Sequence, residues 1–451
     1  VLPFNTDGAS ESERIFAEGL ADSVITRLSR LGGLNIRPID AVRELGGLGR
    51  DPRELGRQLR VDAVLTGAIA RDGGALVVAA ELIDVDNGRL LWSRRFADAN
   101  ANLLVMEQAI VVQLASAVLP TISRQAQSRL ERRYTENAEA NIAYLRGRYF
   151  WGRRTKDGLE RAVASLEQAV HLDPSFGLAA AALADAYVLL SGHRSETQMI
   201  ARARQWALTA LEQDPALGEA HATLGLIAMN YDWDWSGAER EFQTAIRLSP
   251  QYATVHHWYG EYLAYQGRFD EAVAEMRRAA ELDPLSLIIG SDTGKVLFMA
   301  RRYDEAIARL RHTLDLEPDY PLARAFLAYS LSAVGDHAEA ISALQLPGQE
   351  DDVLFLVTAA SVYERAGRHQ DAKAQVQRLI ALSKHSYVTP YLLAYAHVAV
   401  GDFDAAFEAF DRMCAVRGNG AIAVRSNPLS DPVRRDPRFA QLLDRLGMTP
   451  S

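Results

Sequence analysis

The stretch GRFDEAVAEMRRAAELDP, residues 267–284, decides the fold, because RRYDEAIARLRHTLDLEP repeats its form 34 residues later at 301–318. The closing proline recurs at Pro174, Pro215, Pro250, Pro284 and Pro318, and the last four are 35, 34 and 34 residues apart. Two series of small residues keep the same period. The first is Gly147, Ala184, Gly225, Gly260, Gly294, Ala328, Ala360 and Ala394, and the second is Ala162, Ala203, Ala238, Ala272, Ala306, Ala340, Ala372 and Ala406. Such a period predicts a repeat protein in which each unit packs on its neighbours.

These units resemble the tetratricopeptide repeat, a pair of antiparallel helices, over about residues 143–416 and in about eight copies. The physics agrees with the resemblance. Small residues are needed where the two helices of a unit cross closely, and larger ones fill the space between units. A proline at the boundary ends one helix and prepares the next. The sequence therefore predicts an all-α tetratricopeptide-repeat superhelical solenoid over 140–416, closed by a capping segment at 417–451.

The segment YDWDWSGAEREFQTA, residues 231–245, stands out because it concentrates aromatic and acidic residues. In the repeat register Trp235 takes the place of Phe269 and Tyr303, and Asp234 before it suits a helix N-cap. Asp232 and Trp233 are left over. Two interpretations stay open: the segment is the turn of one repeat, or Trp233 and Trp235 form a ligand-contacting aromatic patch.

The first 120 residues have a different character. Strands are predicted at 1–4, 34–40, 61–71, 75–85 and 89–96, and helices at 15–31, 51–60 and 102–119. Gly73-Gly74 and Asn87-Gly88 predict two tight hairpin turns. The prediction is a compact α/β domain over 1–120, joined to the repeats by a linker helix over 121–139.

This N-terminal pattern, VLPF…FAEGLADSVITRLSRLGGLNIRP…ELGRQLRVDAVLTGAIAR…ELIDVDNGRLLWSRRF, resembles the N-terminal domain of TolB-type periplasmic proteins. Followed by such repeats, it is similar to the C-terminal half of bacterial membrane-anchored signalling proteins. Their N-terminal halves carry a winged-helix DNA-binding domain, as in CadC-type regulators, a nucleotide cyclase or a protein kinase. The resemblance implies a sensory or scaffold module on the extracytoplasmic side of a membrane. We expect the output half to lie upstream of Val1.

Composition narrows the possible functions. The 451 residues are 48% apolar and 24% charged, as in a folded protein, and the net charge of −9 argues against nucleic-acid binding. Cys414 is the single cysteine, which excludes an internal disulfide framework and a cysteine-rich zinc site. The most apolar helical stretch, 102–120, contains Glu107 and Gln108, so we expect no membrane-spanning helix.

Motifs of catalysis are not found. The sequence contains no GxxxxGK[ST], GxSxG, HExxH or CxxC. Asp84, Asp86 and Asn87 resemble the start of a calcium loop, but the acidic residue that should close it is lacking and Asn-Gly favours a hairpin turn. We therefore expect a protein that is not an enzyme and uses no cofactor or metal.

The repeat register instead predicts a binding groove. His257, Glu261 and Tyr265 fall at positions that line the concave face of tetratricopeptide arrays, and the same register adds Asp185, Lys295, Phe298 and Tyr329. This mixed polar and aromatic lining suits a peptide or helix. His257 and Glu261 share a helix face, so a metal site, an intrahelical hydrogen bond and a peptide contact are all open, although no third metal ligand is evident. Of the Lys and Asn set that clamps a terminal carboxylate in some arrays, only Lys295 is present.

A basic and aromatic cluster, RGRYFWGRR at 146–154, could contact single-stranded nucleic acid. Its position on the first repeat favours packing of the aromatic rings under the arginine side chains. The overall prediction is a non-catalytic protein- or peptide-binding sensory or scaffold module of a bacterial signalling or transcription-regulatory protein. The alternative is a stand-alone periplasmic scaffold for envelope assembly.

Overall fold

The computed structural model describes residues 1–6, 11–29, 34–44, 51–72, 75–98, 103–119, 133–153, 155–191, 196–345, 352–417 and 420–448. These residues form two compact units. The first consists of Val1–Leu224, Glu241–Val255 and Leu282–Pro284, and the second of Gly225–Arg240, His256–Glu281 and Leu285–Ser451.

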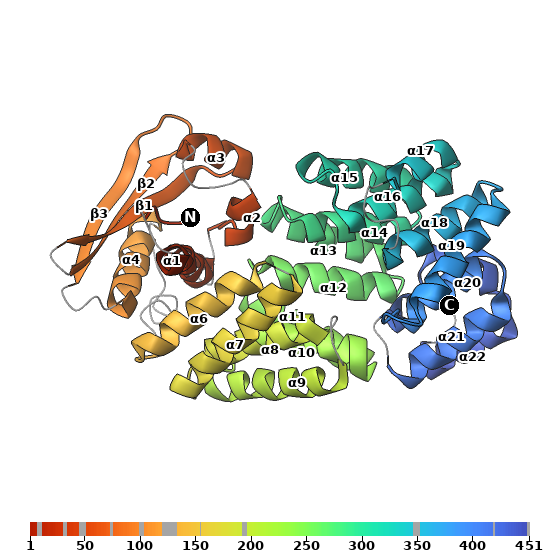
Figure 1. Ribbon diagram of the computed structural model, residues 1–451. Coiled ribbons are helices and arrows are strands. Elements are labelled where there is room, and N and C mark those ends of the chain that lie inside the picture. Colours follow the sequence, from red (N-terminus) through yellow and green to blue (C-terminus); the bar gives the residue numbers. More distant parts are fainter. Residues whose placement is uncertain are drawn as a thin grey trace. The chain divides into compact units, whose positions relative to one another are not determined.

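The first unit opens with the small sheet domain. Its elements are α1 (Glu11–Ser29), α2 (Ile39–Glu44), α3 (Pro52–Leu59), β1 (Ala63–Asp72), β2 (Ala75–Asp84), β3 (Leu90–Asp98) and α4 (Leu103–Val118). The strands form one antiparallel sheet in the order β1-β2-β3, with Gly67 opposite Ala80 and Glu81 opposite Ser93. Helices α1 and α4 lie against this sheet (Figure 1). Leu20, Val24, Val78 and Ile110 meet in the resulting apolar core.

Three local predictions for this domain need correction or limits. Residues 34–38 have no regular secondary structure and pair with no described strand, and α2 already begins at Ile39, so the strand predicted at 34–40 is wrong. Pro38 has no N–H to give to a sheet and stands where a helix can start. Residues 1–6 run beside β1, with one isolated parallel bridge from Asn5 to Ala68. The Gly73-Gly74 turn lies outside the described residues, whereas the Asn87-Gly88 turn is confirmed, with φ of +74° at Gly88.

The linker helix predicted over 121–139 is wrong for residues 133–137. Residues 121–132 lie outside the described ranges, and residues 133–137 are not helical. Asn137 is the N-cap of the next helix, its side chain accepting hydrogen bonds from the backbone N–H groups of Glu139 and Ala140. The first repeat therefore begins at Ala138 with an ordinary capped start.

The repeats follow as eight successive pairs of helices, as predicted. They are α6 (Ala138–Trp151) and α7 (Lys156–Leu172), α8 (Gly177–Ser191) and α9 (Glu196–Gln213), α10 (Gly218–Ile227, continued by the π-helix η1, Ala228–Asp232) and α11 (Trp235–Leu248), α12 (Ala253–Tyr265) and α13 (Phe269–Leu282), α14 (Leu287–Met299) and α15 (Tyr303–Leu316), α16 (Pro321–Val334) and α17 (His337–Ala343), α18 (Val353–Arg365) and α19 (His369–Leu382), and α20 (Pro390–Ala399) and α21 (Phe403–Ala415). The short helices η2 (Ala421–Ala423) and η3 (Pro428–Val433) and the helix α22 (Pro437–Arg445) close the chain.

The small residues do what the period predicts. The second-series alanines, from Ala162 to Ala406, are all fully buried. In the first series, a Cβ built on Gly294 would lie 2.4 Å from Cγ of Leu310, and one on Gly147 would lie 2.4 Å from Cγ of Leu166. The two helices of these repeats therefore approach more closely than any larger side chain allows.

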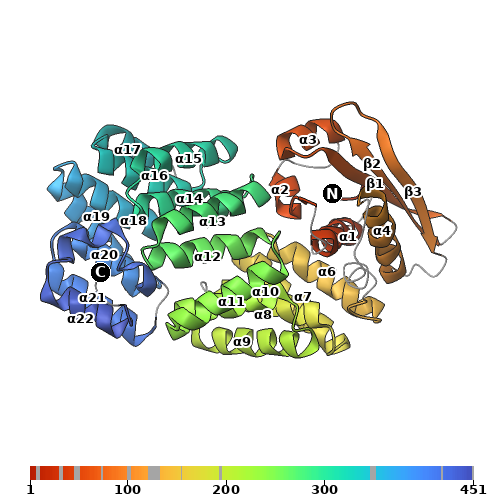
Figure 2. The same cartoon turned by 180° about the vertical axis from the view of Figure 1, so that it is seen from behind.

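Within the second unit, the first helices of successive repeats pack on one another. Helix α14 packs against α16, α16 against α18, and α18 against α20, and Figures 1 and 2 show this row from two sides. Residues that these helices share along one face can thus act together across several repeats.

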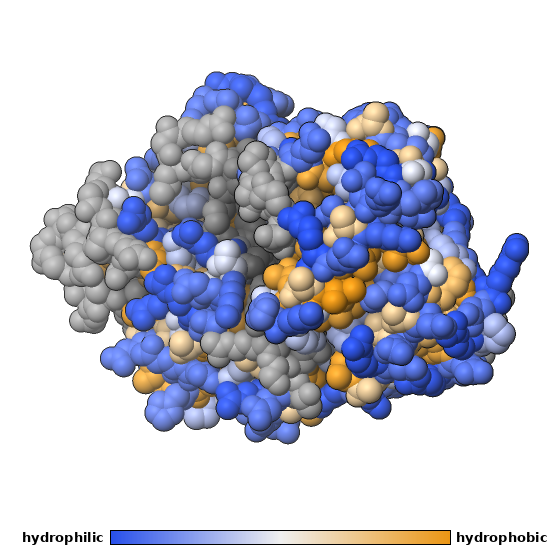
Figure 3. Space-filling model, turned by 45° about the vertical axis from the view of Figure 1, so that its right-hand side comes forward, coloured by the Kyte–Doolittle hydropathy of each residue, from blue (hydrophilic) through white to orange (hydrophobic). Residues whose placement is uncertain are grey.

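The surface is mostly hydrophilic on the face drawn in Figure 3, where apolar residues gather in a patch near the middle of the view. The most exposed large apolar side chain is that of Tyr387, at 72%. Among the described residues, none of the helices has the length and apolar character needed to cross a bilayer.

Candidate functional site

Four charged or ionisable side chains meet between the first helices of the fourth and fifth repeats. His257 and Glu261 stand one turn apart on α12, and Asp292 and Lys295 stand at i and i+3 on α14. We call these four residues the inner charge cluster. Its side chains are only 7%, 13%, 6% and 18% exposed in that order.

Lys295 holds the cluster together. Its Nζ lies 2.5 Å from Oε1 of Glu261 and 2.6 Å from Oδ1 of Asp292. The other oxygen of Asp292 lies 2.8 Å from Nε2 of His257. Tyr265, one turn beyond Glu261, donates its hydroxyl hydrogen to Oε1 of that carboxylate at 3.2 Å. Each polar group therefore has a partner, which buried charges require.

The cluster shifts the pKa values of its members. Burial alone would raise the pKa of Asp292, but the charge of Lys295 and the hydrogen bond with His257 hold it well below its usual range. Burial would lower the pKa of Lys295, but Asp292 and Glu261 raise it well above its ordinary value. The pKa of the Tyr265 hydroxyl is raised by burial and then by the charge of Glu261. Around neutral pH, Asp292 is thus anionic and Lys295 cationic.

A metal ion would compete with Lys295. His257, Glu261 and Asp292 each offer a ligand atom, and these atoms lie within 4.8 Å of one another. Asp292 is the third ligand that sequence reasoning did not find, although its i,i+3 spacing to Lys295 was a usable signal. Because the ammonium group of Lys295 already contacts both carboxylates, a divalent cation would enter only if Lys295 moved away.

Aromatic rings continue the site along the row of first helices. Phe298 stacks on Tyr329, with ring centroids 5.8 Å apart, and both side chains are buried. Tyr391 on α20 is half-buried, and desolvation raises the pKa of its hydroxyl, although a hydrogen bond from Asn427 and the charge of Lys295 oppose the rise. The structure thus brings His257, Glu261, Tyr265 and Lys295 together and places Phe298 and Tyr329 as a neighbouring pair.

Asp185 does not join this group. It lies on α8 in the first unit, where it is 4% exposed and its charge helps burial to raise the pKa of Tyr252. The predicted groove residues therefore belong to two separate units, and only those of the second unit form one cluster.

The two tryptophans of the opening aromatic segment have internal partners. Trp235 is the first residue of α11, as the register predicts, and its Nε1–H donates to the carbonyl oxygen of Leu446 at 3.2 Å. Asp234 caps that helix, accepting the N–H of Gly237 at 2.9 Å, and this hydrogen bond lowers its pKa. The guanidinium group of Arg417 lies 5.3 Å from the ring centroid of Trp233. The structural interpretation is confirmed for Asp234 and for the position of Trp235.

Two other candidate sites have structural roles. In the calcium-like loop, Oδ1 of Asp84 accepts the backbone N–H groups of Asp86 and Asn87, at 3.0 and 3.1 Å, so it serves the hairpin turn. In the basic cluster, Arg148 pairs with Asp22 of α1 at 2.9 Å and also lies over the ring of buried Trp151. The predicted packing role of the basic cluster is confirmed for these residues, while Arg154 lies outside the described ranges.

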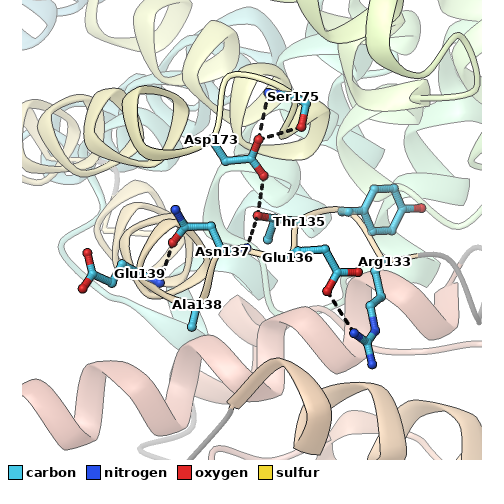
Figure 4. A pocket seen from close by; sticks show the side chains of 9 residues that line it. Arg133, Thr135, Glu136, Asn137, Ala138, Glu139, Asp173 and Ser175 are labelled. Atoms are coloured by element: carbon cyan, nitrogen blue, oxygen red, sulfur yellow. Dashed lines mark hydrogen bonds and ion pairs between the residues drawn. The ribbon is translucent and has the colours of Figure 1, made fainter.

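A surface hollow of about 820 Å³ lies where the segment before α6 meets the turn between α7 and α8 (Figure 4). Thr135 donates to Asp173 at 2.5 Å, and Ser175 donates to the other oxygen of Asp173 at 2.6 Å. Burial would raise the pKa of Asp173, but these hydrogen bonds lower it. The hydrogen bonds among Thr135, Asp173 and Ser175 in Figure 4 thus serve the start of the first repeat.

Comparison with known families supports both parts of the chain. Residues 1–113 match the model of the HilA/YgeH-like transcriptional regulator second domain, and residues 234–286 and 297–353 match tetratricopeptide-repeat models. The chain therefore carries tetratricopeptide repeats together with a HilA/YgeH-like domain. Since the N-terminal match is to this domain, the TolB-type resemblance stays a prediction.

Curated relatives are distant. The chain is 25% identical over 277 residues to transcriptional regulator HilA of Salmonella typhimurium, covering 60% of this chain and 48% of that protein. It is 26% identical over 281 residues to a Rhizobium meliloti protein named "Putative adenylate cyclase 3", covering 60% of this chain and 41% of the relative. The chain thus spans about half the length of these relatives or less. Among solved structures, PilF of Pseudomonas aeruginosa is similar in fold, with 21% identity, 49% of this chain and 96% of that chain covered, and a TM-score of 0.37.

Proposed function

We propose that this chain is the non-catalytic protein- or peptide-binding module of a bacterial signalling or transcription-regulatory protein, and that the face carrying the inner charge cluster is its binding face. The observation that carries the proposal is the cluster itself. Buried ion pairs stabilise a fold no better than well-packed apolar residues, so their presence on the row of first helices calls for another role. Recognition of a polar partner is such a role.

The relatives support the assignment to signalling. One is named as a transcriptional regulator and the other as an adenylate cyclase, and each alignment covers 60% of this chain, so the two necessarily overlap. A region shared by proteins with two different outputs is best understood as the part that senses or binds rather than the part that acts. We propose accordingly that neither nucleic acid binding nor catalysis resides in this chain.

We also propose that this chain lies on the extracytoplasmic side of a membrane. The similarity to CadC-type architecture favours the extracytoplasmic side, with any membrane attachment made by a segment outside this chain. A fusion of alkaline phosphatase to the C-terminus of the full-length protein tests this, because the enzyme is active only after export. An inactive fusion, with an active cytoplasmic reporter at the same place, would reverse the assignment.

The binding face is tested by capture of partners from the source cells on purified chain. The informative variant combines Asp292→Asn with Lys295→Met, because removing both charges of a buried pair disturbs folding far less than removing one. Lys373→Met, at an exposed position of α19, is the matched control. We expect a partner recovered by the wild-type chain and the control to be lost with the double variant. Equal recovery by all three would remove the inner charge cluster from recognition.

A further inference from the structure

In six of the repeats, the structure describes a turn residue with a left-handed backbone at the same position. It stands two residues before the second helix of a repeat, and glycine fills it in four repeats: Gly267, Gly335, Gly367 and Gly401, with φ between +74° and +92°. A Cβ at any of these four glycines would find no other atom within 4 Å. Glycine is the ordinary choice here because other residues are strained in this conformation.

The other two of these six repeats have no glycine there. The third has Trp233, with φ of +57°, and the fifth has Arg301, with φ of +59°. Both accept backbone strain that the four repeats with glycine avoid. The four repeats with glycine show that the turn forms without this strain. The strained residues at Trp233 and Arg301 therefore need another explanation.

Both side chains contact the C-terminal segment, which the structure describes at Arg417 and over residues 420–448. Nη2 of Arg301 lies 2.8 Å from each carboxylate oxygen of Asp431. Arg417 lies over the ring of Trp233 and donates to the carbonyl oxygen of Tyr231 at 3.1 Å. Arg417 itself has a left-handed backbone, with φ of +47°. Glycine at either turn could form neither side-chain contact.

The same segment reaches the proposed binding face. Nδ2 of Asn427 donates to the hydroxyl of Tyr391 at 3.1 Å, and the Ser430 and Tyr395 hydroxyls share a hydrogen bond of 2.8 Å. The charge of Lys295 in the inner charge cluster acts on the Tyr391 hydroxyl, where it opposes the desolvation that raises the pKa of that group. On that face Phe298 and Tyr329 are 1% and 5% exposed, too little for a peptide to contact their rings.

We propose that Arg417 and residues 420–448 form a clasp. It is fastened to the turns of the third and fifth repeats through Trp233 and Arg301, and it has to release before the face with the inner charge cluster accepts a protein or peptide. The gating part rests on the proposed function. The fastening at Arg301 is exposed, with 53% and 40% of the two side chains accessible, so it is weak and sensitive to salt. A clasp that opens on partner binding needs such contacts.

Lysine acylation followed by mass spectrometry tests the clasp without a ligand. The chain has four lysines, of which Lys156, Lys373 and Lys384 are exposed and serve as internal references, whereas the side chain of Lys295 is 18% exposed. The test variant is Arg301→Gly, which restores the usual turn residue. We expect it to raise the acylation rate of Lys295, relative to the references, by about threefold to fivefold. Amide hydrogen exchange in η3 and α22 should rise with it.

The matched control is Gly335→Arg, which places an arginine in the equivalent open turn of the sixth repeat. It should lower the melting temperature through strain and leave Lys295 acylation unchanged. Arg301→Gly should not lower the melting temperature, because it removes strain at the same time as the ion pair. Unchanged acylation and exchange in Arg301→Gly would overturn the clasp.

Partner capture then separates the two proposals. Arg301→Gly should recover more partner than the wild-type chain. If Arg301→Gly shows faster Lys295 acylation but captures no more partner than the wild-type chain, the gating is overturned and partner binding is unaffected. If no variant, wild type included, recovers a partner, the proposed function and the gating both fail, and the acylation result still decides whether the clasp exists.

Discussion

The substitution Lys295→Met makes the sharpest test of the inner charge cluster. It removes the ammonium group that contacts Glu261 and Asp292 and keeps a side chain of similar length. Breaking a buried ion pair by deleting one partner costs about 3–5 kcal/mol. Because the Lys295 side chain retains 18% exposure, we expect the lower end, about 3 kcal/mol, at about pH 8. For a unit of this size, that loss corresponds to a melting temperature lower by about 6–12 °C.

The stability of the variant should change with pH in a range where the contribution of these groups in the wild type does not. In the wild type, the lowered pKa of Asp292 gives stability that is present above the unfolded value of about 3.9 and is lost only as pH falls through the folded pKa. The raised pKa of Lys295 gives stability that is complete below about 10.4 and is lost as pH rises through its folded pKa. Between about pH 5 and 10, the contribution of these two groups is therefore flat.

In Lys295→Met, two buried carboxylates face each other without their cation, so at least one folded pKa rises. A raised carboxyl pKa makes stability increase as pH falls, and the deficit against the wild type should shrink between about pH 8 and about pH 5. Urea unfolding followed by circular dichroism measures it, with Lys373→Met as control. Adding Asp292→Asn should recover most of the loss. A deficit below about 1 kcal/mol at pH 8, or one that stays constant with pH, would show that the cluster is solvated and the reasoning wrong.

Three further substitutions test the repeats and their attachment to the N-terminal domain. Gly294→Ala should lower the free energy of unfolding by about 1 kcal/mol, because overpacking against Leu310 is only partly offset by better helix propensity. The same substitution should be neutral or stabilising when Leu310→Ala is already present. Urea unfolding of the wild type, the two single variants and the double variant measures this difference. Asp234→Ala should lower stability by about 1 kcal/mol in thermal unfolding through loss of the N-cap, and an unchanged melting temperature would contradict the cap. Arg148→Met should cost about 3 kcal/mol by leaving Asp22 buried without its cation, and adding Asp22→Asn should restore most of the melting temperature; failure of that rescue would point to lost packing on Trp151.

The fold was predictable where the chain repeats itself. A fixed spacing of small residues records where two helices touch, and the complete burial of the alanines from Ala162 to Ala406 follows from that contact. The N-terminal domain has no such internal copies. Its segment at 34–38 has strand-like composition, but it pairs with no described strand.

The site was predictable within one helix and not between helices. The i,i+4 spacing of His257 and Glu261 is enough by itself to place both side chains on one face of a helix. The sequence did not predict Asp292 as part of the site. It lies 35 residues after His257, whereas the 34-residue period makes Ser291 the equivalent of His257. Which side chain of a neighbouring helix completes a cluster depends on how the two helices are offset, and sequence period does not fix that offset to one residue.

Trp233 and Arg301 show how repeats serve as their own controls. A non-glycine residue in left-handed backbone costs about 1–2 kcal/mol, whereas an exposed ion pair such as Arg301–Asp431 contributes about 1 kcal/mol or less. Stability alone therefore does not favour arginine over glycine at this turn. Arg301 is explained if its ion pair with Asp431 serves to hold the clasp weakly, because a clasp that opens needs a weak contact. The sequence alone shows that Trp233 and Arg301 are not glycine. Their role became evident only from their contacts with the C-terminal segment.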